Sequence, residues 1–107
     1  MLLQQQKQLD KLVSIITPSF NKADFIVQTV NSVIAQKYPY WEMIIVDDCS
    51  TDNSKKVIER FENEVSIHVV YNSENKGANY CRNLGLSLVT TDYLLFLDGD
   101  DVLEKTC

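Results

Sequence analysis

The sequence lacks the features that define several large classes of protein. No apolar run in its 107 residues approaches the roughly 20 that a membrane-spanning helix needs. Ten Lys and Arg against 15 Asp and Glu leave a net charge of −5, which argues against nucleic acid as a partner. The three cysteines have no Cys-x-x-Cys spacing, as is typical of reduced thiols in a cytoplasmic protein.

The first 11 residues differ from the rest of the chain. They are polar and rich in Gln after Leu2 and Leu3, and they lack the apolar centre of a signal peptide. We predict a flexible leader over residues 1–11, with a short helix as the alternative. Residues 12–107 are predicted to form one soluble subdomain, because the chain is 45% hydrophobic and 23% charged.

Apolar strands alternate with amphipathic helices along this subdomain. Each predicted helix has apolar residues at helical spacing, whereas each predicted strand is a short β-branched or apolar run. Strands are predicted over residues 13–17 (stopped by Pro18), 43–46, 66–71 and 93–97, and helices over 23–36, 53–62 and a segment after Gly77 that carries Tyr80, Leu84 and Leu88.

This alternation predicts an α/β fold. Strands separated by helices form parallel β-α-β units with right-handed crossovers, and the near-continuous apolar strands predict burial on both faces of the sheet. We therefore expect a parallel, Rossmann-like sheet with helices on both faces. No G-x-G-x-x-G motif follows the first strand, which argues against a dinucleotide-dependent oxidoreductase.

Polar residues gather where the predicted strands end. Ligands of such sheets bind at the carboxyl ends of the strands, and these ends deliver five carboxylates: Asp47, Asp48, Asp98, Asp100 and Asp101. They would repel one another unless a cation lay among them, and hard oxygen ligands suit Mg²⁺ or Mn²⁺. Taken singly, Asp98-Gly99-Asp100 also fits a plain turn, and Asp47-Asp48 also fits a loop that caps the next helix.

Four motifs in this order resemble the opening half of the inverting family-2 glycosyltransferases. They are the run Val13-Ser14-Ile15-Ile16-Thr17-Pro18-Ser19-Phe20-Asn21, the run Ile45-Val46-Asp47-Asp48-Cys49-Ser50-Thr51-Asp52, the pair Asn75-Lys76-Gly77 and Arg82-Asn83-Leu84-Gly85-Leu86, and the run from Tyr93 to Asp101. The resemblance covers residues 13–103. It implies the N-terminal half of a GT-A fold, with the sheet in the order 3-2-1-4 and the chain truncated after its D-x-D motif.

The resemblance also implies a role for individual residues. Pro18 and Phe20 would line the base pocket, with Asp48 accepting a hydrogen bond from the base. Phe20 stands where the family usually has Tyr, and Cys49 where it usually has Gly. Asp100 and Asp98 would bind the metal ion, and the full set of nucleotide-sugar-binding residues would be Thr17, Pro18, Phe20, Asn21, Asp48, Asn75, Arg82, Asp98, Gly99 and Asp101.

The activity implied is the metal-dependent transfer of a sugar, with inversion, from a nucleoside-diphospho-sugar donor. UDP is the expected nucleotide, Mn²⁺ or Mg²⁺ the cofactor, and a glycan or lipid-linked molecule of polysaccharide or cell-envelope biosynthesis the acceptor. The catalytic base of this family lies in its second half, so no catalytic residue is assigned in this chain. The expected location is the cytoplasm, with the inner face of the membrane as the alternative.

Two other functions remain open from the sequence. The chain could be a non-catalytic fragment that binds nucleotide and transfers nothing. It could also be a phosphoacceptor receiver-like domain, since the strands that end at Asp48 and Asp98 imitate an acidic pocket; residues 13–36 would then be unexplained.

The last predicted strand suggests self-association. Residues 93–97 are apolar on both faces, yet the order 3-2-1-4 leaves this strand at the edge of the sheet. An apolar edge with unpaired backbone groups is a template for pairing with another chain. We therefore predict a two-fold dimer joined through this strand, and the alternative is that the final residues fold back over the edge.

Overall fold

A computed structural model describes residues 12–89 and 91–103. Their strands are β1 (Val13–Ser19), β2 (Trp41–Asp47), β3 (Ile67–Tyr71) and β4 (Tyr93–Phe96). Their helices are α2 (Ile26–Ile34), α3 (Ser54–Glu59) and α4 (Ala78–Leu88). The predicted leader, residues 1–11, lies outside the described residues.

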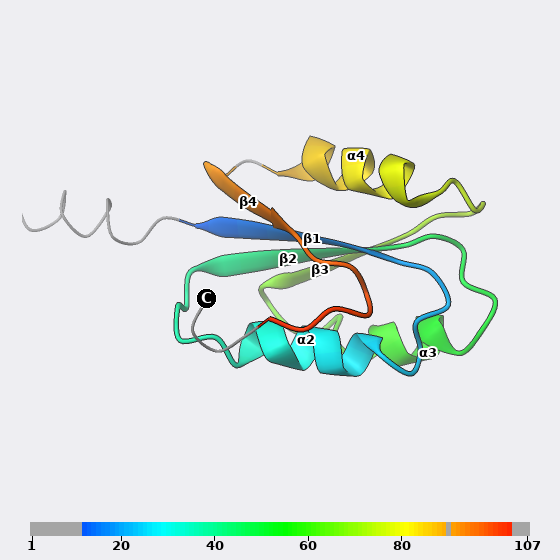
Figure 1. Cartoon of the computed structure of the whole chain (residues 1–107), viewed down its shortest axis with the longest axis horizontal. Helices are drawn as coiled ribbons and strands as arrows, with labels where there is room; N and C mark the ends of the chain where they lie inside the picture. Colours follow the sequence, from blue (N-terminus) through cyan, green and yellow to red (C-terminus); the bar gives the residue numbers. More distant parts are fainter. Residues whose placement is uncertain (1–11, 90, 104–107) are drawn as a thin grey trace, which may run out of the picture.

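The four strands form one parallel sheet in the order β3-β2-β1-β4, which confirms the predicted order. Helices α2 and α3 cover one face, and α4 covers the other (Figure 1). The carboxyl ends of all four strands therefore meet at the same end of the sheet, as the sequence predicted.

The two faces of the sheet bury different amounts of apolar surface. Ile15 and Ile45 point towards α2 and α3, where they join Ile26, Val30 and Ile58 in the main core. The α4 side is smaller; its buried residues are Ile44, Val46 and Cys81. Alternating side chains of the central strands are thus buried on opposite faces, because successive residues of a strand point in opposite directions.

Pro18 lies within β1, so the prediction that it stops the strand is wrong. It is paired in register with Val46 of β2, and β1 continues to Ser19. A proline cannot donate to the ladder, but its carbonyl still accepts a hydrogen bond from the Gly99 N–H at 3.1 Å. The pairing of β1 with β4 ends at Ile16 and Phe96, before Pro18. The N–H that Pro18 lacks is therefore not needed for this pairing.

Of the three large residues by which helix α4 was predicted, only Leu84 packs against the core on this side of the sheet. Cys81 and Gly85 are buried, whereas Tyr80 and Leu88 are 46% and 48% exposed. A Cβ at position 85 would lie 2.5 Å from Cγ2 of Ile16, so only glycine permits this approach of helix to strand. Small residues one turn apart, and not the large apolar ones, set the distance between α4 and β1.

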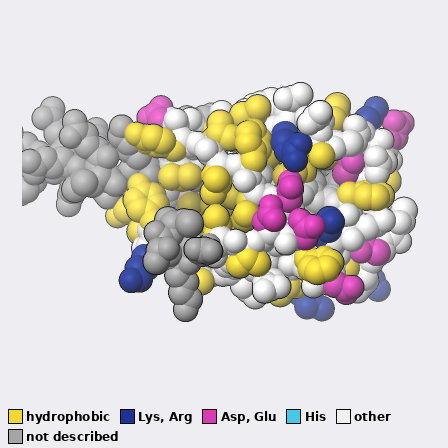
Figure 2. All heavy atoms as spheres, viewed as in Figure 1, with side chains coloured by type: hydrophobic (Ala, Val, Ile, Leu, Met, Phe, Trp, Pro, Cys, Tyr) yellow, Lys and Arg dark blue, Asp and Glu magenta, His cyan; other side chains and the backbone are white. Residues whose placement is uncertain are grey.

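The predicted burial of all strands on both faces holds for β1 and β2 but is wrong for β4. All four β4 residues are between 40% and 49% exposed, and apolar side chains cover this part of the surface (Figure 2). The reason is position: β4 is the outermost strand among the described residues. The described chain after it, up to Leu103, runs along α2, where the Leu103 N–H donates to Ser32 Oγ at 3.0 Å. The alternative that the final residues fold back over the β4 edge also concerns residues 104–107, which lie outside the described residues. Within residues 12–89 and 91–103, no helix has the length and apolar character needed to span a membrane.

Candidate functional site

The end of β1 ties the ends of its two neighbours together. The carbonyl of Ser19 accepts a hydrogen bond from the Asp48 N–H at 2.9 Å, and that of Pro18 accepts from Gly99. The residues that follow β2 and β4 are therefore held on either side of one short segment. This segment brings the two acidic motifs, 51 residues apart in sequence at Asp47 and Asp98, to one place.

Asn21 organises the loop after β2. Its φ of 53° is in the left-handed region, which Asn tolerates better than most residues. Its Oδ1 accepts from the N–H groups of Thr51 at 2.8 Å and Asp52 at 3.2 Å, and its Nδ2 donates to Thr51 Oγ1. Its side-chain amide is thus engaged within the chain.

The two carboxylates at the end of β2 are buried; Asp47 is bonded to the loop that follows it and Asp48 to the segment after β3. Asp47, 2% exposed, accepts from the N–H and the hydroxyl of Ser50. Asp48, 4% exposed, accepts at Oδ1 from Asn72 Nδ2 and the Lys76 N–H, and at Oδ2 from the Gly77 N–H at 2.8 Å. Burial alone would raise the pKa of Asp48, but the hydrogen bonds from Lys76, Asn72 and Gly77 outweigh it and lower the pKa below its usual value.

The three carboxylates after β4 form a separate, more exposed cluster. Asp98, Asp100 and Asp101 each offer an oxygen within 4.8 Å of the others. Two cationic side chains lie against them: Arg82 contacts Asp98 at 3.3 Å, and Lys22 contacts Asp100 at 3.1 Å. Acidic and basic side chains meet on the face shown in Figure 2.

The loop that carries this cluster, residues 98–101, is attached to α2 and is also held by hydrogen bonds of its own. Thr29 of α2 donates its buried hydroxyl to the Gly99 carbonyl at 2.9 Å. Within the loop, the Asp101 N–H donates to the Asp98 carbonyl, and the Asp98 N–H donates to Asp101 Oδ2. Asp101 therefore shapes the turn as well as contributing an oxygen to the cluster.

The five carboxylates lie at one end of the sheet, as predicted, but they divide into two groups. Asp47 and Asp48 are buried and accept hydrogen bonds from the chain itself, whereas Asp98, Asp100 and Asp101 are more exposed. Within residues 12–89 and 91–103, the acidic group close enough to share a metal ion is this second one. Three hard oxygen ligands within this distance fit Mg²⁺ or Mn²⁺.

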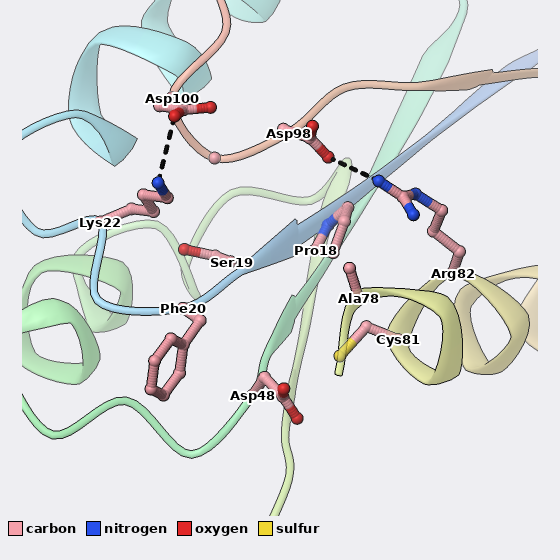
Figure 3. A pocket seen from close by; sticks show the side chains of 11 residues that line it. Pro18, Ser19, Phe20, Lys22, Asp48, Ala78, Cys81, Arg82, Asp98 and Asp100 are labelled. Carbon is pink, nitrogen blue, oxygen red and sulfur yellow. Dashed lines mark hydrogen bonds and ion pairs between the residues drawn. The ribbon is translucent and has the colours of Figure 1, made fainter. Parts of the chain in front are cut away.

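A cavity of about 220 Å³ opens between the two groups (Figure 3). Asp48 lies at one end, Asp98 and Asp100 at the other, with Phe20 beside Asp48 and Arg82 beside Asp98 (Figure 3). The cavity is lined by seven of the predicted site residues: Pro18, Phe20, Asp48, Arg82, Asp98, Gly99 and Asp100.

The other predicted residues lie outside this lining. Thr17 is fully buried, Asn21 holds the loop after β2, Asp101 shapes the acidic turn, and Asn75 is exposed next to Lys76. Thr17 therefore lies in the core beneath the cavity and not on its surface.

Four residues of the cavity were not predicted: Ser19, Lys22, Ala78 and Cys81. Ser19 is 3% exposed, and its hydroxyl makes no hydrogen bond within the described part of the chain. Burial raises the pKa of Cys81 to about 11, with the neighbouring Asp48 adding to the effect, so this thiol is protonated at neutral pH. Lys22 follows Asn21 directly, but nothing in the sequence showed that its side chain would meet Asp100, 78 residues away.

A second cavity, of about 370 Å³, lies at the opposite end of the sheet. Its lining is mainly apolar and includes Val13, Trp41, Leu95 and Leu103. It contains no carboxylate, so the acidic cavity is the better candidate for chemistry.

Comparison with known proteins places this arrangement in a family. The family model described as glycosyl transferase family 2 matches residues 14–107. Among curated relatives, the putative teichuronic acid biosynthesis glycosyltransferase TuaG of Bacillus subtilis is 50% identical over 95 residues; the match covers 88% of this chain and 38% of that protein. The chain thus spans little more than a third of this relative's length.

Solved structures share the fold. TarS of Staphylococcus aureus in complex with UDP superposes with a TM-score of 0.80 at 32% identity, covering 87% of this chain and 28% of that one. The mannosyltransferase PcManGT of Pyrobaculum calidifontis, in complex with GDP-Man and Mn²⁺, gives a TM-score of 0.78 at 25% identity, covering 84% and 28%. These structures were solved with nucleotides, and one of them also with a divalent metal ion.

Proposed function

The chain belongs to glycosyl transferase family 2, and from that premise we propose that it forms the donor-binding part of an enzyme that transfers a sugar from a nucleoside-diphospho-sugar. One observation carries this proposal: a cavity bounded by an aromatic ring and a buried carboxylate at one end and by exposed carboxylates at the other. Such a cavity offers a nucleoside diphosphate a stacking surface, a hydrogen-bond acceptor and ligands for a bridging cation.

Phe20 and Asp48 would hold the base. The Phe20 ring is 40% exposed beside the cavity, which leaves a face for stacking. Asp48 Oδ2 has one donor from the chain, the Gly77 N–H, whereas Oδ1 has two. Because a carboxylate oxygen accepts about two hydrogen bonds, Oδ2 retains a position for an N–H of the base.

Arg82 and the acidic cluster would hold the diphosphate. The Arg82 guanidinium is oriented by Asn79 Oδ1 at 3.1 Å and by Asp98, and its planar donors suit phosphate oxygens. Asp98 and Asp100 would bind Mn²⁺ or Mg²⁺, with Asp101 supporting the turn and Asp98 also within reach of the ribose. When bound, the metal ion supplies stabilisation of the negative charge on the departing nucleoside diphosphate.

The remaining predicted residues would support the shape of the cavity or approach the nucleotide from its edge. Gly99 permits the acidic loop to approach Ser19, since a Cβ there would lie 2.9 Å from Ser19 Oγ. Asn21 and Thr17 would support the loop and the floor, and Asn75 would approach the nucleotide from the loop after β3. No carboxylate of the described residues is assigned as the base for inversion; we place that base outside this chain, as we do the contacts with a glycan or lipid-linked acceptor.

The nucleotide is proposed to be UDP. TarS, which is similar over most of this chain, was solved with UDP and with UDP-GlcNAc, whereas PcManGT was solved with GDP-Man. Relatives in teichuronic acid biosynthesis and poly(ribitol-phosphate) modification support a role in making cell-envelope polysaccharide. Cytoplasmic donor sugars would suit a cytoplasmic site, and this location stays a prediction.

Calorimetric titration with UDP, GDP and dTDP, each with Mn²⁺ and with EDTA, tests the proposal. We expect UDP to bind most tightly and Mn²⁺ to strengthen its binding. Asp100→Asn should abolish the Mn²⁺ effect and leave the fold intact. Asp92→Asn, which removes the same charge from an exposed residue just before β4, should keep it. Equal UDP affinity with Mn²⁺ and EDTA in the unmodified chain would show that the metal role of Asp100 is wrong.

Two further functions are weighed against this one. A nucleotide-binding chain without transfer shares the same cavity, so titration with nucleotides supports both functions alike. A receiver-like domain is disfavoured, because β1, which that fold would not explain, lies between β2 and β4.

Self-association through β4 is part of the proposal for this chain. Leu94, Leu95 and Phe96 are each at least 40% exposed, and no described strand pairs with the far edge of β4. Antiparallel pairing of two β4 strands about a two-fold axis would cover this edge. Light scattering at low micromolar concentration should show a dimer that Leu95→Lys disrupts; a monomer in both proteins would rule it out.

A further inference from the structure

Lys22 is held by hydrogen bonds at its backbone, whereas its ammonium is held, among the described residues, only by a partly exposed ion pair with Asp100. Its N–H donates to Ser54 Oγ at 3.1 Å, and its carbonyl accepts from the N–H groups of Phe25 and Ile26. The starts of α2 and α3 thus hold its backbone in place. Its side chain, 35% exposed, extends along the cavity to Asp100 (Figure 3).

The acidic loop is equally fixed where it meets Lys22. A Cβ added to Gly99 would lie 3.2 Å from Lys22 Cγ and 2.9 Å from Ser19 Oγ, so the two segments are already in close contact. Thr29 holds the Gly99 carbonyl from the other side. Any change of partners between these segments must therefore be made by the ends of the side chains.

The two cations of the site differ in how firmly they are placed. Arg82 has two acceptors, Asn79 Oδ1 at 3.1 Å and Asp98 at 3.3 Å, and a planar head. Within the described residues, the Lys22 ammonium contacts Asp100 Oδ2 at 3.1 Å. The two ion pairs are similarly exposed, with Asp100 43% and Asp98 48% exposed, so the difference lies in the second acceptor of Arg82 and in its planar head. A half-exposed ion pair of this kind contributes little free energy, so the Lys22 ammonium exchanges partners easily.

We propose that Lys22 exchanges Asp100 for the diphosphate of the nucleotide, and that this exchange couples nucleotide binding to metal binding. The inference rests on the proposed function. Without nucleotide, the ammonium neutralises the carboxylate oxygen that a divalent cation would need, and two cations at one oxygen repel each other. With nucleotide, the diphosphate offers Lys22 a more highly charged partner, and Asp100 becomes available.

The consequence is a reciprocal coupling. If nucleotide strengthens Mn²⁺ binding by some factor, Mn²⁺ must strengthen nucleotide binding by the same factor. Lys22 would contribute to that factor by weakening metal binding to the free chain and by strengthening nucleotide binding. A residue that acted only as a static positive charge would leave the factor unchanged.

The test measures Mn²⁺ affinity with and without saturating UDP, and UDP affinity with Mn²⁺ and with EDTA, by calorimetry. In Lys22→Met, which keeps the aliphatic stem against Gly99, Mn²⁺ should bind the free chain roughly threefold to tenfold more tightly. UDP in EDTA should bind more weakly by a similar factor, and the coupling should fall accordingly. Lys22→Arg should restore part of it.

Lys76→Met is the matched control. It removes the same charge from an ion pair of the same 3.1 Å length, with Glu74, on the loop before α4. Both affinities and the coupling should stay as in the unmodified chain. Circular dichroism and thermal unfolding check that each variant is folded, and Lys22→Gln replaces Lys22→Met if that variant is not.

The outcomes separate the inference from its premise. Unchanged coupling in Lys22→Met, or Mn²⁺ and UDP binding weakened together, would overturn the role of Lys22 and leave the proposed function intact. Failure of UDP to bind the unmodified chain under either condition would overturn the proposed function, and the inference with it.

Discussion

The acids at the end of β2 and those after β4 follow similar apolar strands, but they differ in burial and in the kind of hydrogen-bond donor they contact. Asp47 and Asp48 are at most 4% exposed and accept hydrogen bonds from backbone N–H groups and short side chains. Asp98 and Asp100 instead face the long side chains of Arg82 and Lys22. The β2 acids accept mainly from backbone N–H groups, whose positions the fold fixes. Asp98 and Asp100 accept from the ends of long side chains, which can change partners by rotating.

This difference separates stability from binding. Removing a buried carboxylate that accepts several part-buried hydrogen bonds leaves their donors without this partner, which is costly, whereas removing one member of an exposed ion pair costs little. We therefore expect the loss of a β2 acid to destabilise the fold, in addition to any loss of the base contact proposed for Asp48, and the loss of a β4 acid to affect mainly ligand binding. The predictions below test this division.

The largest effect is expected for Asp48→Ala. It would leave the Lys76 and Gly77 N–H groups and the Asn72 amide without their acceptor, and we expect the free energy of unfolding to fall by about 3 kcal/mol. Asp100→Ala should change it by less than about 0.5 kcal/mol. Urea denaturation of both variants measures the contrast, and equal losses would contradict the division.

Phe20→Ala should come next, with nucleotide binding weakened by roughly 1–3 kcal/mol through lost base stacking. Because Phe20 lies at the Asp48 end of the cavity, the loss should be the same with Mn²⁺ and with EDTA. Phe20→Tyr should bind at least as well as the unmodified chain. Calorimetry with UDP measures all three proteins, and unchanged affinity in Phe20→Ala would place the ring outside the binding site.

The sequence was enough to predict where the two acidic groups lie, but not whether their carboxylates are buried or which donors they bind. Alternating apolar strands and helices were enough to predict a parallel sheet and to bring Asp48 and Asp98 to one end, whereas the strand order came from the resemblance to the family-2 glycosyltransferases. Whether a carboxylate is buried depends on donors far away in sequence, such as Asn72 for Asp48 and Lys22 for Asp100. No local pattern shows those pairings.

The end of the first strand at Pro18 was mispredicted, whereas the helix after Gly77 was predicted correctly, although its Tyr80 and Leu88 are exposed. A proline is a strand breaker only if its missing donor is needed, and that depends on where the neighbouring strand ends. The face of α4 was judged from large apolar residues, yet the close approach at Gly85 decides it. The four sequence motifs identified seven of the residues that line the cavity. The other four, Ser19, Lys22, Ala78 and Cys81, were not assigned to the site from the sequence, and only the folded structure shows that they line it.

A smaller effect should appear as the pH falls. The pKa of Asp48 is lowered by its hydrogen bonds below the unfolded value of 3.8, so the ionised carboxylate stabilises the fold. That contribution is fully present above the unfolded pKa and is lost as the pH falls through the folded one. The difference in unfolding free energy between the unmodified chain and Asp48→Asn should therefore shrink at acid pH. Denaturation series from neutral pH down to about pH 3 measure it; a constant difference would show that ionisation is not involved.

The smallest effect is expected for Cys49→Gly, in the loop after Asp48. Cys49 has a φ of 61°, a left-handed conformation that costs a non-glycine residue roughly 1–2 kcal/mol. Glycine removes this strain but gains freedom in the unfolded chain, and the lost Cys49 Sγ–H contact with the Ser73 carbonyl is weak. We expect a net stabilisation of about 0.5 kcal/mol by thermal unfolding, and a loss of stability would show that the thiol contributes more than its geometry suggests.

Two hydroxyl groups of α2 hold the chain that follows β4. Thr29 bonds to the Gly99 carbonyl and Ser32, one turn later, to the Leu103 N–H, so the segment bearing the acidic cluster is attached at two points to a helix that packs on the sheet. Its conformational entropy is therefore given up when the chain folds and not when a ligand arrives. A nucleotide that enters this cavity has only side-chain ends to order, and more of its contact energy remains available as affinity.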